Sequence, residues 1–243
     1  GAHPLPLDRA WTAIQKSLRE SKRRTSWTRT NEPYEDATFR FLESVLNDAS
    51  FVADLDQVVA SLVDPGRINS LAQVALRLLS PGVPDTYQGC ELWDSSLVDP
   101  DNRRAVDYGK RAAALSAIDG VKVAEVWSEH RDEGWPKLAL LRACLQLRRR
   151  HLDAFGHDST YVPLTVNGED AHRVIAFERG RRVVAVVPRL PRRGLPDSAV
   201  VTLPEGNWTN ILTGDRHSGE ASFAKLSGAF PLAVLELELD PVV

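Results

Sequence analysis

The chemically richest stretch of this sequence lies between residues 80 and 104, where turn residues, aromatic rings and carboxylates are concentrated. A helix with an apolar face is expected to end at Pro81-Gly82, and a short strand-like segment and a long polar loop follow it. Carboxylates, amides and guanidinium groups on such a loop can hydrogen-bond a polar ligand, while aromatic rings offer it flat faces. Because rigid scaffolds often deliver functional side chains on loops, we predict a site here.

Thiol, metal and histidine chemistry are not predicted. Cys90 and Cys144 are the only cysteines, and they lack metal-ligand spacing. Residues 99–103 begin like a calcium loop, but Arg103 occupies the fifth position and no glycine follows. The histidines show neither ligand nor triad spacing. We therefore expect no metal and no cofactor.

The composition is that of an ordinary globular protein, with 43% hydrophobic and 26% charged residues. A formal net charge of -3 gives no electrostatic reason to expect nucleic acid or an anionic membrane as a partner. The basic runs 22–24 and 148–150 each end an expected helix, where cations complement the helix dipole. No apolar run approaches membrane-spanning length, the first residues lack a signal-peptide core, and the two cysteines are distant, so a reduced cytoplasmic protein is predicted.

The first 155 residues are predicted to be mostly helical. Helices are expected, in chain order, over 8–24, 33–46, 51–63, 67–79, 108–118 and 135–151. Asp8 is the candidate cap of the first helix, and Pro33 suits the first turn of the second. Asp64-Pro65-Gly66 is expected to separate the third helix from the fourth. Residues 25–32 have no regular period, which places Trp27 in a loop.

From Tyr161 onward the pattern changes to short apolar runs divided by Pro, Gly and Asp. Residues 173–177 and 182–187, on either side of Arg179-Gly180, predict a hairpin. Further strands are expected over 200–203, 208–212, 221–226 and 232–239. Residues 156–243 are therefore predicted to form an antiparallel β-sandwich.

Several amphipathic helices with one short strand do not make a complete fold. Such a set is typical of the last turns of a repeating α/β unit, so residues 1–155 are predicted to be the C-terminal part of a (β/α)8 barrel, including its eighth strand and loop. The fold class is thus α then β, with an all-β domain at 156–243. The sequence has no Met, even at position 1, and we expect a chain that was processed, tagged or excised from something longer.

Two motifs resemble a known family. Residues 81–91 resemble the last barrel strand and loop of the α-amylase family of glycoside hydrolases, usually written PGxPxxYxGxE. Residues 91–94, 97–104 and 106–108 are similar to one group within that family, and so are residues 24–28 followed by Asn31-Glu32 and Tyr34-Glu35. The helix over 141–151 and the following β module with Tyr161 also fit the C-terminal part of that group. The resemblance covers nearly the whole chain.

The resemblance implies an intramolecular transglycosylation. In this group the reducing-end α-1,4 bond of a maltooligosaccharide becomes an α,α-1,1 bond, which leaves a trehalose terminus. Retaining chemistry of this kind needs a carboxylate nucleophile and a carboxylic acid about 5 Å apart. The family places these groups and a third carboxylate on barrel strands four, five and seven, so we expect all three upstream of Gly1 and no catalytic residue in this chain. The expected partners are the substrate and the missing N-terminal catalytic part.

The visible residues are then predicted to bind substrate and exclude water on the leaving-group side of the pocket. The aromatic members would stack on the sugar and the polar members would hydrogen-bond its hydroxyls. The predicted substrate-binding residues are Trp27, Tyr87, Gln88, Glu91, Trp93, Asp94, Asp101, Asn102, Arg103 and Arg104.

Structural alternatives compete with these roles. Trp27 can instead plug a gap between two helices, and Tyr87 can pack inside a barrel. Asp99 and Asp101 can cap turns and pair with Arg103 or Arg104. Glu91, by contrast, is expected near the site, since a carboxylate just past a strand end is seldom buried unpaired.

Two other functions remain open at this point. One is a free-standing carbohydrate-binding or structural module in which the β-sandwich does the work, although the long helical part argues against it. The other is a different α-amylase-family enzyme, such as a sucrose-processing one, with a similar eighth loop. If residues 1–155 are a piece of a barrel, apolar helix faces are exposed, and we expect the chain to associate rather than remain a lone monomer.

Overall fold

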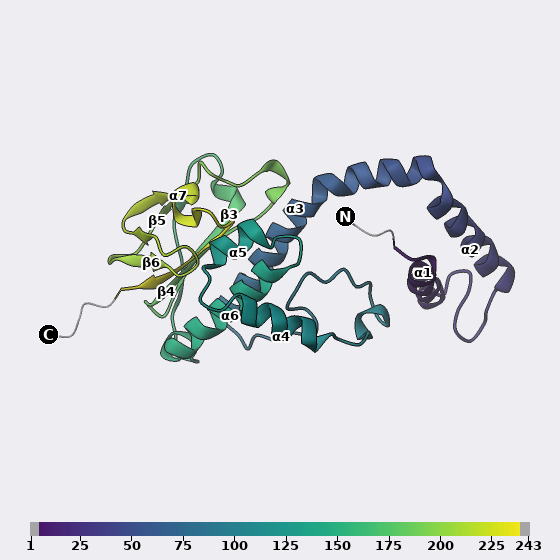
Figure 1. Ribbon diagram of the computed structural model, residues 1–243, viewed down its shortest axis with the longest axis horizontal. Coiled ribbons are helices and arrows are strands. Elements are labelled where there is room, and N and C mark those ends of the chain that lie inside the picture. Colours follow the sequence, from purple (N-terminus) through teal and green to yellow (C-terminus); the bar gives the residue numbers. More distant parts are fainter. Residues whose placement is uncertain (1–4, 239–243) are drawn as a thin grey trace. The chain divides into compact units, whose positions relative to one another are not determined.

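The computed structural model describes residues 5–238, and Figure 1 labels the α-helices and some of the strands. The chain forms two compact units. The first comprises Gly1–Leu62 and Ser95–Val106, and the second comprises Val63–Asp94 and Asp107–Val243. The predicted division at residue 155 concerns the domains of the whole protein, and it stays a prediction.

The first unit is built on α1 (Leu7–Ser21), α2 (Glu32–Asn47) and the beginning of α3 (Ala49–Leu79). The prediction that Asp8 caps α1 is wrong, because Pro6 is the capping residue and Asp8 lies in the first turn. Asn31 caps α2 by accepting a hydrogen bond from the amide of Tyr34 at 3.3 Å. Pro33 lies in the first turn of α2, as predicted.

Helix α3 corrects a second prediction. Residues 49–79 form one helix of 31 residues, with Pro65 inside it, instead of two helices. Proline removes one helical hydrogen bond, but the buried residues between Leu71 and Leu79 hold the following turns by packing. Asp48 begins the helix, since its carboxylate accepts hydrogen bonds from the amides of Ser50 (2.9 Å) and Phe51 (3.1 Å).

The second unit contains the end of α3 and the helices α4 (Tyr108–Ala117), α5 (Val123–Glu129), α6 (Trp135–Arg150) and α7 (Phe223–Ser227). The predicted helices over 108–118 and 135–151 are confirmed as α4 and α6. Helix α5 was not predicted, because seven residues are too few to show a helical period.

The strand expected near Tyr87 is not formed by the described residues. The segment between α3 and the short turn Asp101–Arg103 contains no strand. A strand is defined by hydrogen bonds to a neighbouring strand, and both sheets of the structure lie later in the chain. The assignment of this segment to a barrel strand therefore remains a prediction about the whole protein.

The strands form two antiparallel sheets. Their bounds are β1 (Tyr161–Pro163), β2 (Val166–Asn167), β3 (Val174–Arg179), β4 (Val183–Pro188), β5 (Val200–Thr202), β6 (Trp208–Asn210), β7 (Arg216–His217), β8 (Glu220–Ser222) and β9 (Ala233–Leu237). The larger sheet has the order β1-β3-β4-β9-β6-β7, and the smaller has the order β2-β5-β8.

The predicted hairpin is confirmed by the pairing of β3 with β4, in which Val174 lies opposite Pro188 and Arg179 opposite Val183. The strand predicted over 221–226 is wrong beyond Ser222, which caps α7 by accepting a hydrogen bond from the amide of Lys225 at 3.3 Å. The last predicted strand is β9, and its predicted end at Leu239 lies outside the described residues.

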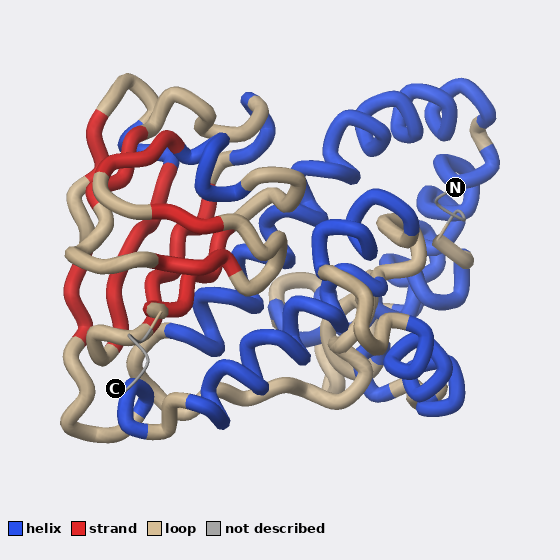
Figure 2. The backbone as a smooth tube through the Cα atoms, turned by 60° about the vertical axis from the view of Figure 1, so that its left-hand side comes forward, coloured by secondary structure: helices blue, strands red, loops and turns tan. Residues whose placement is uncertain are grey.

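Strand β4 is buried along its whole length because its two faces pack in two different cores. Figure 2 shows the strands in red and the helices in blue. Val183, Ala185 and Val187 pack in one core with residues of α3, α4, α5 and α6. Val184 and Val186 pack in a second core with the smaller sheet and α7. The alternation follows from the two-residue period of a strand.

The end of α6 is tied to this sheet. Arg150 donates hydrogen bonds to both carboxylate oxygens of Glu236 on β9, at 3.0 and 2.8 Å, and His151 Nε2 lies 2.6 Å from the same carboxylate. The prediction that the basic run 148–150 ends a helix is thus confirmed. Within residues 5–238, none of the helices combines the length and the apolar composition needed to cross a membrane.

Candidate functional site

The ten predicted substrate-binding residues fall into two groups. Trp27 and residues 101–104 belong to the first compact unit, whereas Tyr87, Gln88, Glu91, Trp93 and Asp94 belong to the second. Each group is built around a carboxylate that is paired with an arginine.

Trp27 lies in the loop that joins α1 to α2. The amide of Ser26 donates to the carbonyl of Arg29, and the amide of Arg29 donates to Ser26 Oγ, both at 3.0 Å. Residues 26–29 therefore form a tight turn, with Trp27 inside it. Trp27 is 57% exposed, so it does not plug a gap within this unit. Its indole ring is available to a ligand.

Glu35 of α2 holds this loop in place, and it is only 4% exposed. Arg19 donates to its two oxygens at 2.9 and 2.6 Å, Gln15 donates at 3.1 Å, and Thr25 donates at 2.6 Å. Thr25 Oγ1 in turn accepts a hydrogen bond from the amide of Asn31 at 3.1 Å. We refer to Glu35, Arg19, Gln15 and Thr25 as the Glu35 network.

The Glu35 network keeps its carboxylate ionised. The hydrogen bond from Arg19 outweighs the opposing effect of burial and, with those from Thr25 and Gln15, lowers the pKa of Glu35 to about 2. A carboxylate with such a pKa and four donors is unsuited to general acid catalysis near neutral pH. Its role in the fold is to position its neighbours.

One of those neighbours is Trp27. The guanidinium carbon of Arg19 lies 4.9 Å from the centroid of the indole ring, within the range of a cation–π contact. Because Glu35 binds Arg19 through two parallel hydrogen bonds, the guanidinium has a fixed orientation. The Glu35 network therefore orients the exposed indole through Arg19.

A groove of about 370 Å³ lies beside the Glu35 network, between α1 and α2. Trp11 and Phe39 form its aromatic part and pack edge to face with ring centroids 5.3 Å apart. Its polar lining includes Glu32, Asp36 and Arg19. None of the ten predicted residues is among its lining residues, and helical spacing alone does not predict such a groove.

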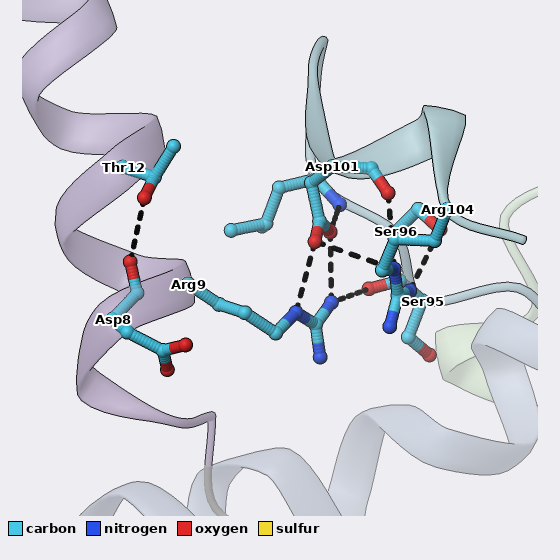
Figure 3. A network of polar contacts seen from close by, with 8 residues as sticks. Asp8, Arg9, Thr12, Ser95, Ser96, Asp101 and Arg104 are labelled. Carbon is cyan, nitrogen blue, oxygen red and sulfur yellow. Dashed lines mark hydrogen bonds and ion pairs between the residues drawn. The ribbon is translucent and has the colours of Figure 1, made fainter.

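The second part of this unit's candidate site is the loop 95–104, shown in Figure 3. Arg9 donates to the two carboxylate oxygens of Asp101 at 2.9 and 2.8 Å, and the amide of Leu97 donates to the same carboxylate at 2.7 Å. Arg104 binds the carbonyl of Asp101 at 3.0 Å and Ser96 Oγ at 3.1 Å. The hydrogen bond from Arg9, followed by that from Leu97, lowers the pKa of Asp101 to about 2. Asp101 thus fixes the loop to α1.

The neighbouring charges are also paired. Arg103 forms an ion pair with Asp99, and Lys16 Nζ donates to the same carboxylate at 3.1 Å and to the Asp99 carbonyl at 2.7 Å. These ion pairs are of the kind expected if Asp99 and Asp101 have structural roles. The side chain of Arg103 nonetheless remains 70% exposed, and Asn102 is exposed. Both can reach a ligand on this side of the loop.

In the second unit, the loop 80–94 is organised by Glu91. Arg111 of α4 donates from Nε to Glu91 at 2.7 Å and from Nη2 to the carbonyl of Gly89. The amide of Gly89 donates to the Glu91 carboxylate at 3.4 Å. We refer to Glu91, Arg111 and Gly89 as the Glu91 network. Burial opposes ionisation here, but Arg111 and the backbone amides outweigh it and hold the pKa of Glu91 below its ordinary value.

Tyr87 and Gln88 lie just before this network. Tyr87 is 46% exposed, and Gln88 Oε1 accepts a hydrogen bond from the hydroxyl of Tyr108 at 3.2 Å. The ring of Tyr87 can therefore meet a ligand, while the Gln88 amide is oriented by α4.

Trp93 is held by its own unit. Its indole Nε1 donates to the carbonyl of Arg131 at 2.7 Å, and its ring packs against the core of the unit. Gly134 allows this approach, because a Cβ there would lie 2.5 Å from the Trp93 amide nitrogen, and its φ of +81° also favours glycine. Trp93 therefore positions the loop and offers only part of its ring.

Cys90 and Asp94 complete this group. Cys90 Sγ lies 3.6 Å from a carboxylate oxygen of Asp94, and burial together with the Asp94 charge raises the pKa of the thiol. The thiol is thus protonated at neutral pH and is a poor nucleophile. Lys137 of α6, whose pKa is lowered by burial, donates to the carbonyl of Leu92 at 3.1 Å.

The sequence identified the loops but missed the residues on helices that hold them. These are Arg9, Arg19, Glu35, Tyr108, Arg111 and Lys137. All of them except Tyr108 are charged residues on helices adjacent to the loops, and Glu35 and Tyr108 also fall in motifs that carry the resemblance. Charged residues on helices are usually solvated, so such signals do not single out a partner.

Both curated proteins and solved structures are similar to this chain. Two curated proteins from strains of Mycobacterium tuberculosis, each named putative maltooligosyl trehalose synthase, are 39% identical over 231 aligned residues, and the match covers 93% of this chain. The solved structure of maltooligosyltrehalose synthase from Arthrobacter ramosus matches 97% of this chain with a TM-score of 0.85 and 33% identity. The chain is similar to a C-terminal portion of maltooligosyltrehalose synthases. No family model matches it.

The similarity covers only part of each synthase. The chain spans 28% of the length of the curated synthases and 31% of the Arthrobacter ramosus chain. Another solved maltooligosyl trehalose synthase matches 96% of this chain with a TM-score of 0.80 and 27% identity. The resemblance of the loop motifs to one group of the α-amylase family is thus matched by relatives that carry the synthase name.

Within residues 5–238, no group of three or more His, Cys, Asp and Glu side chains is arranged to hold a metal ion.

Proposed function

We propose that this chain supplies walls of the substrate pocket in a maltooligosyltrehalose synthase. The reaction implied by the resemblance converts the reducing-end α-1,4 bond of a maltooligosaccharide to an α,α-1,1 bond within one molecule. The synthase relatives, with 39% identity over 93% of this chain, support this assignment. Residues 1–155 are assigned to the end of the (β/α)8 barrel and residues 156–243 to a C-terminal β-sandwich, an assignment supported by the helices and by the two antiparallel sheets.

The carboxylates that make and break glycosidic bonds are assigned to the part of the synthase that lies outside this chain. Glu35, Glu91 and Asp101 are each ionised and bound to an arginine. A retaining glycosidase needs one protonated carboxylic acid and one free nucleophilic carboxylate about 5 Å apart. The best-placed acidic residues of the predicted site fill neither role, which supports the expectation of no catalytic residue here.

The main observation in support of this proposal concerns Trp27. Trp27 is 57% exposed although its indole is held by the Glu35 network through Arg19. An aromatic ring that is both exposed and oriented is suited to stacking on the apolar face of a pyranose. Tyr87, Gln88, Asn102 and Arg103 are proposed as further contacts to the sugar.

The remaining predicted residues receive positioning roles. Asp101 and Arg104 brace the loop 95–104, Trp93 anchors the loop 80–94, and Glu91 orients that loop through Arg111. Asp94 lies at the end of the same loop, beside Cys90.

Water exclusion follows from these roles. After the first bond breaks, the released glucose must turn and attack through its anomeric hydroxyl before water reaches the glycosyl-enzyme intermediate. An oriented indole restrains the sugar during this turn and occupies volume that water would otherwise fill. Loss of the indole should therefore favour hydrolysis over transglycosylation.

The test is Trp27→Ala in the full-length enzyme with maltopentaose as substrate. We expect the ratio of released glucose to trehalose-ended product to rise about tenfold, which corresponds to about 1.4 kcal/mol of differential barrier. Arg103→Ala should raise the ratio less, because its side chain is exposed and flexible. Products are separated and counted by chromatography.

Leu152→Ala is the control, since this residue is 74% exposed and is not among the proposed contacts. The control should leave the ratio unchanged. An unchanged ratio in Trp27→Ala, with an unfolding midpoint equal to that of the parent enzyme, would refute the water-exclusion role.

The alternative of a free-standing β-sandwich module is disfavoured by the core of the second unit. Phe177, Val183 and Val234 of the larger sheet pack in one core with helical residues such as Leu140 and Leu147. A module made of the sandwich alone would expose this apolar face to water. The third alternative, a different α-amylase-family enzyme, is disfavoured because the curated relatives carry the synthase name.

A further inference from the structure

An apolar stripe runs along the first half of α3 in the first unit. It consists of Phe51, Leu55, Val58 and Leu62, which are 44%, 43%, 58% and 42% exposed. Their spacings of four, three and four residues place all four on one face of the helix. The stripe extends about 17 Å along the helix axis at 1.5 Å per residue. We call these four residues the α3 stripe.

Such a stripe differs from scattered exposed apolar residues. A helix in water normally turns its apolar residues toward a core and its polar residues outward. The second half of the same helix does so, since Leu71, Ala75 and Leu78 are fully buried or nearly so. The α3 stripe has the periodicity of a packed helix face without a packed neighbour among the residues that the structure describes, and this periodicity indicates an interface.

The charged residues near the stripe indicate which kind of partner surface would match it. No lysine, arginine or histidine occurs between residues 41 and 66. The acidic residues of this segment within the first unit are Glu43, Asp48, Asp54 and Asp56, of which Asp48 begins α3. A partner surface that is apolar at its centre and carries lysine or arginine at its edge would therefore match both the apolar stripe and the negative charge of this segment.

A second copy of this chain fits poorly. In a two-fold contact the same patch faces itself, so the middle of the α3 stripe would meet the middle of its copy. Asp54 lies at the edge of the stripe near that midpoint, about 70° around the helix from its centre, and its equivalent would lie in the same contact. Like charges brought together in this way disfavour the contact.

We infer that the α3 stripe is the docking surface for the portion of the full-length synthase that lies outside this chain, through an apolar patch rimmed by basic residues. The chain spans 28% of the length of its curated relatives, so most of such an enzyme lies elsewhere in its sequence. The inference uses the similarity to synthases but none of the proposed sugar contacts. Its test measures burial, so it can fail while the Trp27 test succeeds, and the reverse also holds.

The experiment is cysteine labelling of the native full-length enzyme that carries this sequence. Leu55→Cys places a thiol in the stripe, and Ala60→Cys places one on the opposite, exposed face of the same helix. The two variants are treated with a maleimide under native conditions, and labelling at each position is followed by peptide mass spectrometry. We expect the thiol at position 55 to react at least about tenfold more slowly than the thiol at position 60, because only buried groups need local opening to react.

Three results would overturn the inference. Equal and fast labelling would mean that the stripe is open in the whole enzyme. Slow labelling at both positions would mean that the contact is not specific to the stripe. Protection at position 55 that disappears on dilution, together with a halved mass in light scattering, would assign the stripe to a second copy.

A second pair of variants tests the same contact through its strength. Leu55→Asp adds a charge to the stripe, and Ala60→Asp adds the same charge to the same helix on the other face. We expect Leu55→Asp to increase amide hydrogen exchange across residues 49–62 at least about tenfold more than Ala60→Asp does. Equal increases in the two variants would contradict the proposed contact.

Discussion

The Glu35 network and the Glu91 network use the same pair of groups in different settings. In both, an arginine from a helix binds the carboxylate that anchors a loop. Glu35 is 4% exposed and receives hydrogen bonds from three side chains, whereas the Glu91 side chain is 22% exposed and receives a single side-chain hydrogen bond. A carboxylate with more donors and less water constrains its loop more strongly.

The difference matters for the aromatic residue that each network holds in place. The Glu35 network presents Trp27 with its indole exposed, and the loop of the Glu91 network presents Tyr87 while Trp93 is packed against the core. The more strongly bound carboxylate thus supports the more exposed tryptophan. Substitutions in the two networks should therefore differ in their effect on stability.

The largest effect is expected for Glu35→Gln in the full-length enzyme. The substitution leaves Arg19 facing a neutral amide in a mostly buried place, so we expect a loss of about 3 kcal/mol in the free energy of unfolding. Denaturant unfolding measures this loss, and tryptophan emission should also change because Arg19 lies over Trp27.

Glu32→Gln is the matched control for that prediction. It removes a carboxylate one turn earlier on α2, where the side chain is exposed. Its effect should stay within about 0.5 kcal/mol. If both substitutions cost the same, Glu35 does not have the anchoring role assigned to it.

A smaller effect, below that of Glu35→Gln at neutral pH, is expected on acidification. The pKa of Glu35 is about 2 in the folded protein and 4.5 without these contacts, so its stabilisation is complete above pH 4.5 and is lost as the pH falls toward 2. Asp101 acts in the same direction between its ordinary value of 3.8 and about 2.

Unfolding free energies measured from pH 7 to pH 3 should therefore show the parent enzyme and Glu35→Gln converging as the pH falls. The convergence should begin near pH 4.5, because protonated Glu35 loses the same interactions that the glutamine lacks. A constant difference across this range would show that the ionised carboxylate is not the source of the stability.

The smallest effect is expected for Glu91→Gln. Since this carboxylate is partly exposed and the side chain of Arg111 is its ion-pair partner, we expect about 1 kcal/mol of destabilisation in the same assay. Arg111 can keep its hydrogen bond to the carbonyl of Gly89 in the variant. A loss as large as that of Glu35→Gln would erase the contrast between the two networks.

Much of the architecture could be predicted from local patterns. The helices α1, α2, α4 and α6 and the β3–β4 hairpin follow from apolar periodicity and from turn residues. The break expected at Pro65 was wrong because packing of the following turns outweighs the lost hydrogen bond. The strand expected beyond Ser222 was wrong because the serine caps a short helix instead.

The candidate site could be predicted only in part, for a physical reason. Loop composition located Trp27 and Glu91, but the partners Arg19 and Arg111 lie on helices 8 and 20 residues away along the chain, and their contacts depend on how those helices pack. Composition also does not distinguish a carboxylate that binds ligand from one that braces a loop. Asp101 is predicted as a ligand contact, and the structure shows its carboxylate bound to Arg9.

Strand β4 has a consequence for how the second unit folds and unfolds. Its odd-numbered residues from Val183 to Val187 contact the helices, and its even-numbered residues contact the smaller sheet and α7. Strand β4 thus packs against both the helices and the smaller sheet with α7, so neither of these layers can separate from it without exposing apolar residues of β4. The helices of this unit and both sheets should therefore melt in a single cooperative transition, as one folding unit.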